Sequence, residues 1–307
     1  MWLPTRGSEL RRVVANIDPG PRSRLLALLT KDFKGVIPAD FMKDMRVVYQ
    51  LSESEAAALL LAIAKGFARP SLSGFAVGAA LRCKDGHFYL GCNLEFPGQP
   101  LFQSVHAEQS ALALASIHAK DFDRLYVSEA PCGHCRQFLM EYGLPPDFPI
   151  AVSGHDLQTL SSLLPMAFGP ADLGVQSRAS AATSPNLREL DHFGKPSPSA
   201  TCALRAAKKS HAPYSLAPCG AGLEMKDGHL IAGSYVESAA YNPSLGALQA
   251  ALIQSNFLGY GSADIKAAAL AYIPALDHLM PATAALSSLV NIEIEPILLR
   301  RGSDDYE

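Results

Sequence analysis

The amino-acid sequence predicts a layered α/β fold that occurs twice along the chain and follows a short helical region. Its 307 residues, 49% of them hydrophobic, are enough to form two domains of ordinary size. Strand and helix patterns alternate in the first half as β-β-α-β-α-β, the order of a layered α/β domain. A long stretch of that half returns about 142 residues later in modified form, which indicates a duplicated domain.

The charge balance and the distribution of apolar residues exclude several classes of protein. Lys and Arg total 26 against 29 Asp and Glu, giving a net charge of -3 and a pI near 6.3. Proteins that bind nucleic acid or membrane surfaces usually carry a basic excess. The most apolar stretch, residues 56–64, is about half the length that crosses a bilayer, and the first residues lack the apolar core of a signal peptide. We therefore expect a cytoplasmic protein with no nucleic-acid or membrane partner.

The elements of the first half can be predicted in chain order. Residues 1–48 are expected to form short helices and loops. Ser52, with Glu55 three residues later, is a capping-box pattern that predicts a helix from there to about Phe67. The later patterns predict strands at 74–83 and 87–95 joined by a Lys-Asp-Gly turn, a helix at 106–117, a strand at 124–128, a helix beginning at the proline of 131, and a strand at 149–153.

The second copy follows residues 178–199, a segment rich in Ser, Pro and Ala that is expected to be a linker. The stretch "GAALRCKDGHFYLGCNLE" returns as "GAGLEMKDGHLIAGSYVE", so that Gly91 matches Gly233 and Glu95 matches Glu237. The predicted organisation is a helical region at 1–48, a catalytic domain at 49–177, the linker, and a degenerate, non-catalytic domain at 200–307.

The two copies differ in polar residues. "VHAEQSALAL" in the first half corresponds to "LGALQAALIQ" in the second, where Gln109 pairs with Gln249 and nothing corresponds to His106 and Glu108. The second half also lacks the Cys-Gly-His-Cys of residues 132–135. Because the scaffold is kept without these groups, we infer that they serve a purpose other than folding.

His106, Cys132 and Cys135 are of the types that bind zinc, and with Glu108 they form the His-x-Glu and Pro-Cys-x-x-Cys pattern of zinc nucleobase deaminases. Three protein ligands leave one position open for water, and both cysteines fall at a predicted helix start that favours thiolates. A zinc-bound water would have its pKa lowered towards about 7. We expect Glu108 to accept its proton and deliver it to the ring nitrogen and the leaving amine.

Two other interpretations of these residues stay open. His134 could complete a closed structural zinc site, although Glu108 would then have no purpose. Cys132 and Cys135 could instead be a redox pair. The remaining cysteines, Cys83, Cys92, Cys202 and Cys219, are expected to be reduced thiols in a cytosolic chain.

Four stretches, "HAEQSA", "PCGHCRQF", "SGFAVGAAL" and "GCNLEFPG", carry a specific resemblance to the dimeric, two-domain cytidine deaminases of bacteria and plants. "AFGPADL" and the altered repeat extend it over residues 45–300 or so. The resemblance implies a three-layer α/β/α sandwich with a mixed sheet, a degenerate second copy, one catalytic zinc per chain, and a homodimer in which the second domain lies near the partner's active site.

The resemblance also implies roles for residues around the zinc. Asn93 and Glu95 resemble the pair that hydrogen-bonds the ribose hydroxyls, and Phe75 resembles the aromatic residue that packs on the pyrimidine. The Ala107 backbone would contact the base, and Phe168 would form another wall of the substrate pocket. Phe75 could instead be a strand-core residue, and Asn93 a turn residue.

The expected reaction is hydrolytic deamination of cytidine and 2′-deoxycytidine to uridine and 2′-deoxyuridine with release of ammonia, as in pyrimidine salvage. Zinc hydroxide would attack C4, and Glu108 would shuttle the protons. Deamination within single-stranded nucleic acid is the alternative, but it needs a basic groove with stacking aromatics. A non-catalytic zinc scaffold is a third interpretation, and the presence of Glu108 argues against it.

Overall fold

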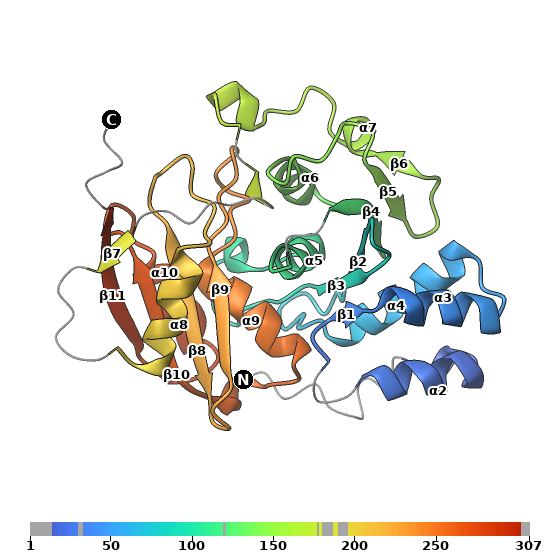
Figure 1. The fold of residues 1–307 in the computed structure, drawn as a ribbon, viewed down its shortest axis with the longest axis horizontal. Helices are drawn as coiled ribbons and strands as arrows, with labels where there is room; N and C mark the ends of the chain where they lie inside the picture. Colours follow the sequence, from blue (N-terminus) through green and yellow to red (C-terminus); the bar gives the residue numbers. More distant parts are fainter. Residues whose placement is uncertain are drawn as a thin grey trace.

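A computed structural model describes residues 14–29, 33–118, 121–176, 178–179, 187–189 and 196–301. The chain forms two sheets, each with helices on both faces, as the sequence predicts (Figure 1). The first thirteen residues and most of the segment predicted as a linker lie outside the described residues. The predicted domain boundaries stay predictions.

The first sheet has the strand order β1-β3-β2-β4-β5-β6, in which only β4 and β5 run parallel. The strands are β1 (Val36–Ile37), β2 (Gly78–Cys83), β3 (Phe88–Cys92), β4 (Phe122–Val127), β5 (Pro149–Val152) and β6 (Gln158–Thr159). The helices of this half are η1 (Val14–Asn16), α2 (Pro19–Leu28), α3 (Ala39–Val48), α4 (Glu53–Gly66), η2 (Leu101–Gln103), α5 (Ala107–Ser116), α6 (Gly133–Met140), α7 (Leu160–Leu163) and η3 (Pro170–Leu173).

The second sheet repeats the central strands of the first in the order β7-β11-β10-β8-β9, with β10 and β11 parallel. Its strands are β7 (Leu187–Glu189), β8 (Cys219–Met225), β9 (Leu230–Ser234), β10 (Ile265–Tyr272) and β11 (Ile294–Arg301). Its helices are α8 (Pro198–Ala207), α9 (Ala247–Phe257), η5 (Ser262–Asp264) and α10 (Leu279–Ser287). The register repeats as well, since Ala79 pairs with Gly91 and Ala221 with Gly233.

Neighbouring residues of β3 show how the helices cover opposite faces of the sheet. A Cβ on Gly91 would overlap the backbone of α5 at Ala107 and Ala111. The thiol of Cys92, the next residue, donates to the carbonyl of Phe67 at the end of α4. Because successive side chains of a strand point to opposite faces, α4 and α5 form the two outer layers.

The second half is layered in the same way. A Cβ on Gly233 would overlap α9 at Ala247 and Ala251. The hydroxyl of Ser234, the next residue, donates to the carbonyl of Ala206 in α8 over 2.8 Å. The three-layer arrangement and its duplication are therefore confirmed.

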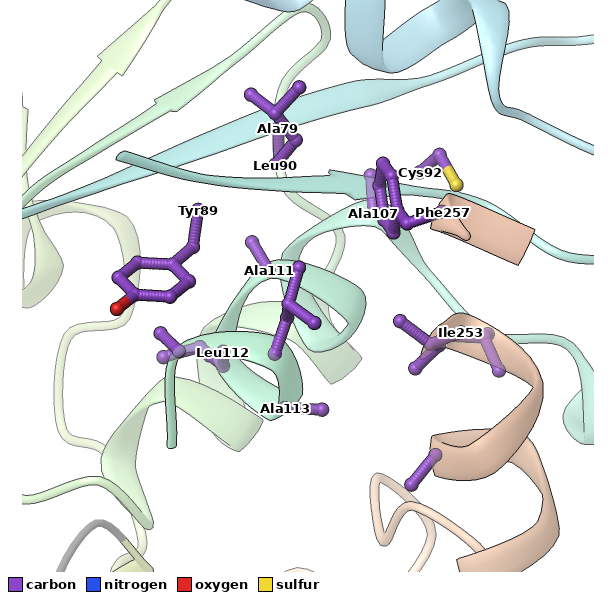
Figure 2. Close-up of a cluster of buried hydrophobic side chains, with 14 of the residues drawn as sticks. Ala79, Tyr89, Leu90, Cys92, Ala107, Ala111, Leu112, Ala113, Ile253 and Phe257 are labelled. Carbon is purple, nitrogen blue, oxygen red and sulfur yellow. The ribbon is translucent and has the colours of Figure 1, made fainter. Parts of the chain in front are cut away.

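The two halves share one hydrophobic core, in which α5 and α9 contact one another (Figure 1). Figure 2 shows Phe257 of α9 next to Ala107 and Cys92, and Ile253 on the side of α9 that faces α5. The ring of Phe257 also packs on Phe67 at the end of α4, with centroids 4.9 Å apart. The second half therefore buries apolar surface directly against the helix that begins with the motif residues.

Two local differences from the sequence expectations have physical causes. The region predicted as helices and loops contributes β1, which pairs with β3 and forms the edge of the first sheet. The strand expected from residue 74 begins at Gly78. Gly74 has a φ of +66°, outside the β region, and the N–H of Val77 donates to the side chain of Asn93 over 2.9 Å. The segment before β2 is therefore a loop held by a side chain.

No helix among the described residues has the length and apolar character needed to cross a membrane.

Candidate active site

The predicted metal ligands meet where two helices begin. His106 is the N-cap residue of α5, and Cys132 is the N-cap residue of α6, with Cys135 in the first turn of that helix. The Nδ1 atom of His106 lies 3.4 Å from the Cys132 Sγ and 3.3 Å from the Cys135 Sγ, and the two sulfurs lie 3.7 Å apart. Over the described residues, this is the one group of three or more such side chains that could hold a metal ion.

These three distances fit tetrahedral zinc. Ligands at the usual Zn–S distance of about 2.3 Å and Zn–N distance of about 2.0 Å are separated by about 3.8 Å between sulfurs and about 3.5 Å between nitrogen and sulfur. The observed separations agree with both values. His134 is exposed and is not a member of the group, so the geometry does not support a closed site with four protein ligands.

The electrostatics of the cluster favour a cation. Hydrogen bonding with Cys135 and then with His106 lowers the pKa of the Cys132 thiol, and Cys135 has its pKa raised by Cys132 and by burial. The two shifts are opposite in direction because each cysteine is a hydrogen-bond partner of the other. The pKa of His106 is raised, chiefly by its hydrogen bond with Cys132. A dication bound between them would favour two thiolates and a neutral imidazole.

Glu108 lies in the first turn of α5, two residues after His106. Its side chain is 4% exposed, and burial is the main cause of its raised pKa. A carboxyl group in such a place takes up a proton more readily than one in water. The structure thus places the predicted acid beside the predicted metal ligands.

Backbone hydrogen bonds place the segment that contains Asn93 and Glu95 beside the residues that lead into His106. Leu94 and Val105 exchange two backbone hydrogen bonds of 2.9 and 2.8 Å, and Val105 immediately precedes His106. The side chain of Asn93 donates to the carbonyl of Phe75 over 3.0 Å. The side chain of Asn93 therefore holds the backbone of the segment that contains Phe75.

Glu95 is almost fully buried, and a loop surrounds its carboxylate. The carboxylate accepts the N–H groups of Leu72 and Ser73 at 2.7 and 2.9 Å and the Ser73 hydroxyl at 2.6 Å. Burial acts to raise the pKa of Glu95, but the hydrogen bonds from Ser73 and Leu72 outweigh it, so the pKa lies below its ordinary value. Sequence reasoning missed Ser73, whose partner is 22 residues away.

The remaining predicted substrate residues differ in exposure. Phe75 is 56% exposed and Phe168 is 47% exposed, so neither is a core residue of this chain. The carbonyl of Phe168 accepts a hydrogen bond from Gln137 of α6, two residues after Cys135. Ala107 is fully buried at the start of α5.

Two further residues support the site. Arg136 donates to the carbonyls of Pro131 and Leu163, each over 2.7 Å, and so fixes the loop that leads into Cys132. Gln109 accepts the backbone N–H of His106 over 3.1 Å. The signal for Gln109 was its place three residues after the N-cap, where Glu and Gln complete a capping box.

Both halves of the chain are similar to proteins of one known family. Residues 52–149 and 160–275 each match a family described as the cytidine and deoxycytidylate deaminase zinc-binding region. A cytidine deaminase of Aliivibrio fischeri is 36% identical over 284 residues, 92% of this chain and 94% of that protein. The chain belongs to the cytidine deaminase family. A cytidine deaminase of Proteus mirabilis is 37% identical over 268 residues, 86% of this chain and 89% of that protein.

A crystal structure of the cytidine deaminase from Burkholderia pseudomallei is 29% identical, covers 38% of this chain and 100% of that chain, and has a TM-score of 0.33. The matched family regions are zinc-binding, and zinc is accordingly the cofactor of this chain.

Among the described residues of the second half, no such group of ligands lies at the corresponding place. Gly246 is the N-cap residue of α9, Leu248 follows it where Glu108 follows His106, and His278 is the N-cap residue of α10. A groove of about 520 Å³ is lined by His106 and His134 and also by residues of the second half, including Tyr235, Tyr241 and His278. One groove therefore borders both the candidate metal site and the corresponding region of the second half.

Proposed function

We propose that the chain catalyses the hydrolytic deamination of cytidine and 2′-deoxycytidine to uridine and 2′-deoxyuridine with release of ammonia, in cytoplasmic pyrimidine salvage. The observation that carries this proposal is the cluster of His106, Cys132 and Cys135 beside the buried carboxyl of Glu108. Three ligands with a neighbouring acid suit a hydrolytic zinc site, whereas a structural site uses four protein ligands.

His106, Cys132 and Cys135 would hold the zinc ion, which when bound supplies a water of lowered pKa as the nucleophile for C4. Glu108 accepts the proton of that water, because its buried carboxylate has a raised proton affinity. It would deliver that proton to the ring nitrogen, and it would then pass the second proton of the attacking water, from the hydroxyl on C4, to the amine that leaves as ammonia. Glu108 lies two residues from His106 at the start of α5, so the same helix start positions the acid and the ligand.

The substrate would be bound by residues that the site already connects. Glu95 receives three hydrogen bonds, and a carboxylate offers about four lone-pair positions, so one can still accept a ribose hydroxyl. Asn93 would hold the second hydroxyl. The exposed rings of Phe75 and Phe168 would pack on the base, and Ala107 would contact it through the backbone.

The second half would act as a non-catalytic domain, with domains at residues 1–48, 49–177 and 200–307 and a linker between the last two. We further propose a homodimer in which this domain lies near the partner's active site. Leu101, Phe102 and Tyr241 line the groove and are 76%, 75% and 66% exposed, which is the character of a surface that another chain covers.

The test is to supply the purified protein with cytidine, 2′-deoxycytidine, cytosine and a single-stranded oligonucleotide containing cytosine, and to measure ammonia and ultraviolet absorbance. The proposal expects turnover of both nucleosides. Turnover of the oligonucleotide alone would overturn it. Light scattering should give twice the chain mass of 32.7 kDa, and a monomeric mass would overturn the dimer.

A further inference from the structure

The side chain of Gln109 connects the candidate metal site to the second half of the chain. Gln109 is 5% exposed and is the third residue of α5. Its Oε1 accepts the backbone N–H of His106 over 3.1 Å, and its Nε2 donates to the carbonyl of Pro243 over 2.8 Å. Pro243 lies 134 residues along the chain, in the loop before α9. Both ends of one buried amide are therefore engaged, one on each half.

The bond to His106 fixes the residue that begins the helix. The first N–H groups of a helix have no partner within the helix. The backbone N–H of the N-cap residue is likewise without a partner unless a side chain, such as that of the residue three positions later, accepts it. With the N–H held, the backbone of His106 keeps its extended conformation (φ −90°, ψ 157°). The direction in which the imidazole leaves the backbone is fixed at the same time. Groups that orient a metal ligand in this way tune how tightly the metal is held.

The second half contains a matching glutamine. Gln249 is the third residue of α9 and is 8% exposed. Its Nε2 donates over 2.8 Å to the Oε1 of Gln103, three residues before His106. Each half thus donates one amide hydrogen bond to the segment before the other half's central helix. The difference lies at the N-cap, which is His106 in α5 and Gly246, with no side chain, in α9.

We propose that Gln109 is a positioning residue through which the second half holds His106 in the orientation that binds zinc. The proposal rests on the proposed function only in taking His106 as a zinc ligand. It gives the degenerate half a part in the chemistry of the same chain, through the Pro243 carbonyl. Gln249 makes the equivalent contact and serves folding alone.

The test compares Gln109→Leu with Gln249→Leu, two buried amides replaced by apolar groups of similar size. Zinc release to a chromogenic chelator is followed for each variant, and the d–d absorption of the cobalt-substituted protein reports the ligand geometry. Loss of a group that orients a metal ligand typically weakens metal binding by about 10- to 100-fold. We expect that loss, with an altered cobalt spectrum, for Gln109→Leu, and zinc release within about twofold of wild type for Gln249→Leu. Equal zinc release from the two variants would overturn the proposal.

Gln109→Glu serves if Gln109→Leu does not fold. A glutamate keeps an acceptor for the His106 N–H but has no donor for the Pro243 carbonyl. Faster zinc release from Gln109→Glu supports the link to the second half, and wild-type release overturns it. Zinc release is measured without substrate, so a wild-type protein that holds zinc but does not deaminate cytidine would overturn the proposed function and leave this result standing.

Discussion

Gly91 of β3 lies directly against Ala107, the first residue of α5, so closely that a Cβ on the glycine would overlap the Ala107 carbonyl. Gly233 of β9 has the same relationship to Ala247 of α9. The close approach of strand and helix is thus a property of the duplicated scaffold. In the first half, this close approach also sets the distance between the sheet and the start of α5, which carries His106 and Glu108.

Gly91→Ala should therefore damage activity beyond its effect on stability. Adding one methyl group to a packed interior costs about 1–3 kcal/mol, which we expect for both Gly91→Ala and Gly233→Ala. A displacement of catalytic groups by about 1 Å can lower turnover by about 10²-fold. We expect that loss for Gly91→Ala alone, measured as kcat at saturating cytidine below the melting temperature of both variants. Equal kcat values would contradict the assignment of α5 as the catalytic helix.

Removal of one predicted ligand should remove the zinc. Cys132→Ala leaves two protein ligands, too few for a stable tetrahedral site, and we expect zinc content to fall from about one to near zero per chain with loss of activity. Cys202→Ala is the matched control, since Cys202 is a buried thiol of α8 outside the cluster. Elemental analysis after gel filtration provides the measurement. Full zinc occupancy in Cys132→Ala would show that the ligand set is wrong.

Phe75 should contribute to substrate binding more than to stability. Its ring is 56% exposed, so Phe75→Ala removes little buried surface and should leave the melting temperature nearly unchanged. Loss of an aromatic contact worth about 0.5–1.5 kcal/mol raises KM by about 2- to 10-fold. Val47→Ala, at a 71% exposed site on α3, is the control. A large fall in melting temperature with unchanged KM would restore the interpretation of Phe75 as a core residue.

The stability that Glu53 contributes at neutral pH should be lost in acid. Its pKa is lowered by the hydrogen bond from Tyr126 and by Arg82 and Arg124, whose guanidinium groups lie 3.0 and 3.1 Å from the carboxylate. A lowered pKa in the folded state adds stability above the ordinary value of 4.5, and that stability is lost as the pH falls through the folded-state pKa.

Because the Glu53 side chain is 33% exposed and solvent screens the pair, the effect should be about 1 kcal/mol or less. Urea unfolding of wild type and Glu53→Gln between pH 3 and pH 7, with Glu129→Gln as a more exposed control, would measure it. The wild-type advantage should be present near pH 7 and shrink in acid. A difference that does not change with pH would contradict the lowered pKa.

The candidate site could be predicted from the sequence where neighbouring residues carry the chemistry. His106 with Glu108, and Cys132 with Cys135, are local patterns at helix starts, and the spacing of three residues between the two cysteines places their side chains on one side of a helix. The duplicated half showed that the scaffold does not require them. The strands and helices of both halves followed from periodicity and from turn residues such as those of 84–86.

Contacts between distant residues could not be predicted in this way. No local pattern pairs Gln109 with Pro243 or Ser73 with Glu95, because tertiary packing brings these residues together. β1 has two residues, too few to show a strand period. The sequence of the loop before β2 has the apolar character of a strand. In the structure, however, the N–H of Val77 donates to the side chain of Asn93 and not to a neighbouring strand.

The most direct test of the central claim compares wild type with Glu108→Gln, which keeps the shape of the side chain and removes its capacity to carry a proton. Deamination of cytidine is followed by the loss of ultraviolet absorbance, and zinc is quantified in both proteins. We predict about one zinc per chain in each and a fall in kcat of about 10²- to 10⁴-fold for Glu108→Gln. Wild-type turnover by Glu108→Gln, or no turnover by a wild-type protein that holds zinc, would contradict the account.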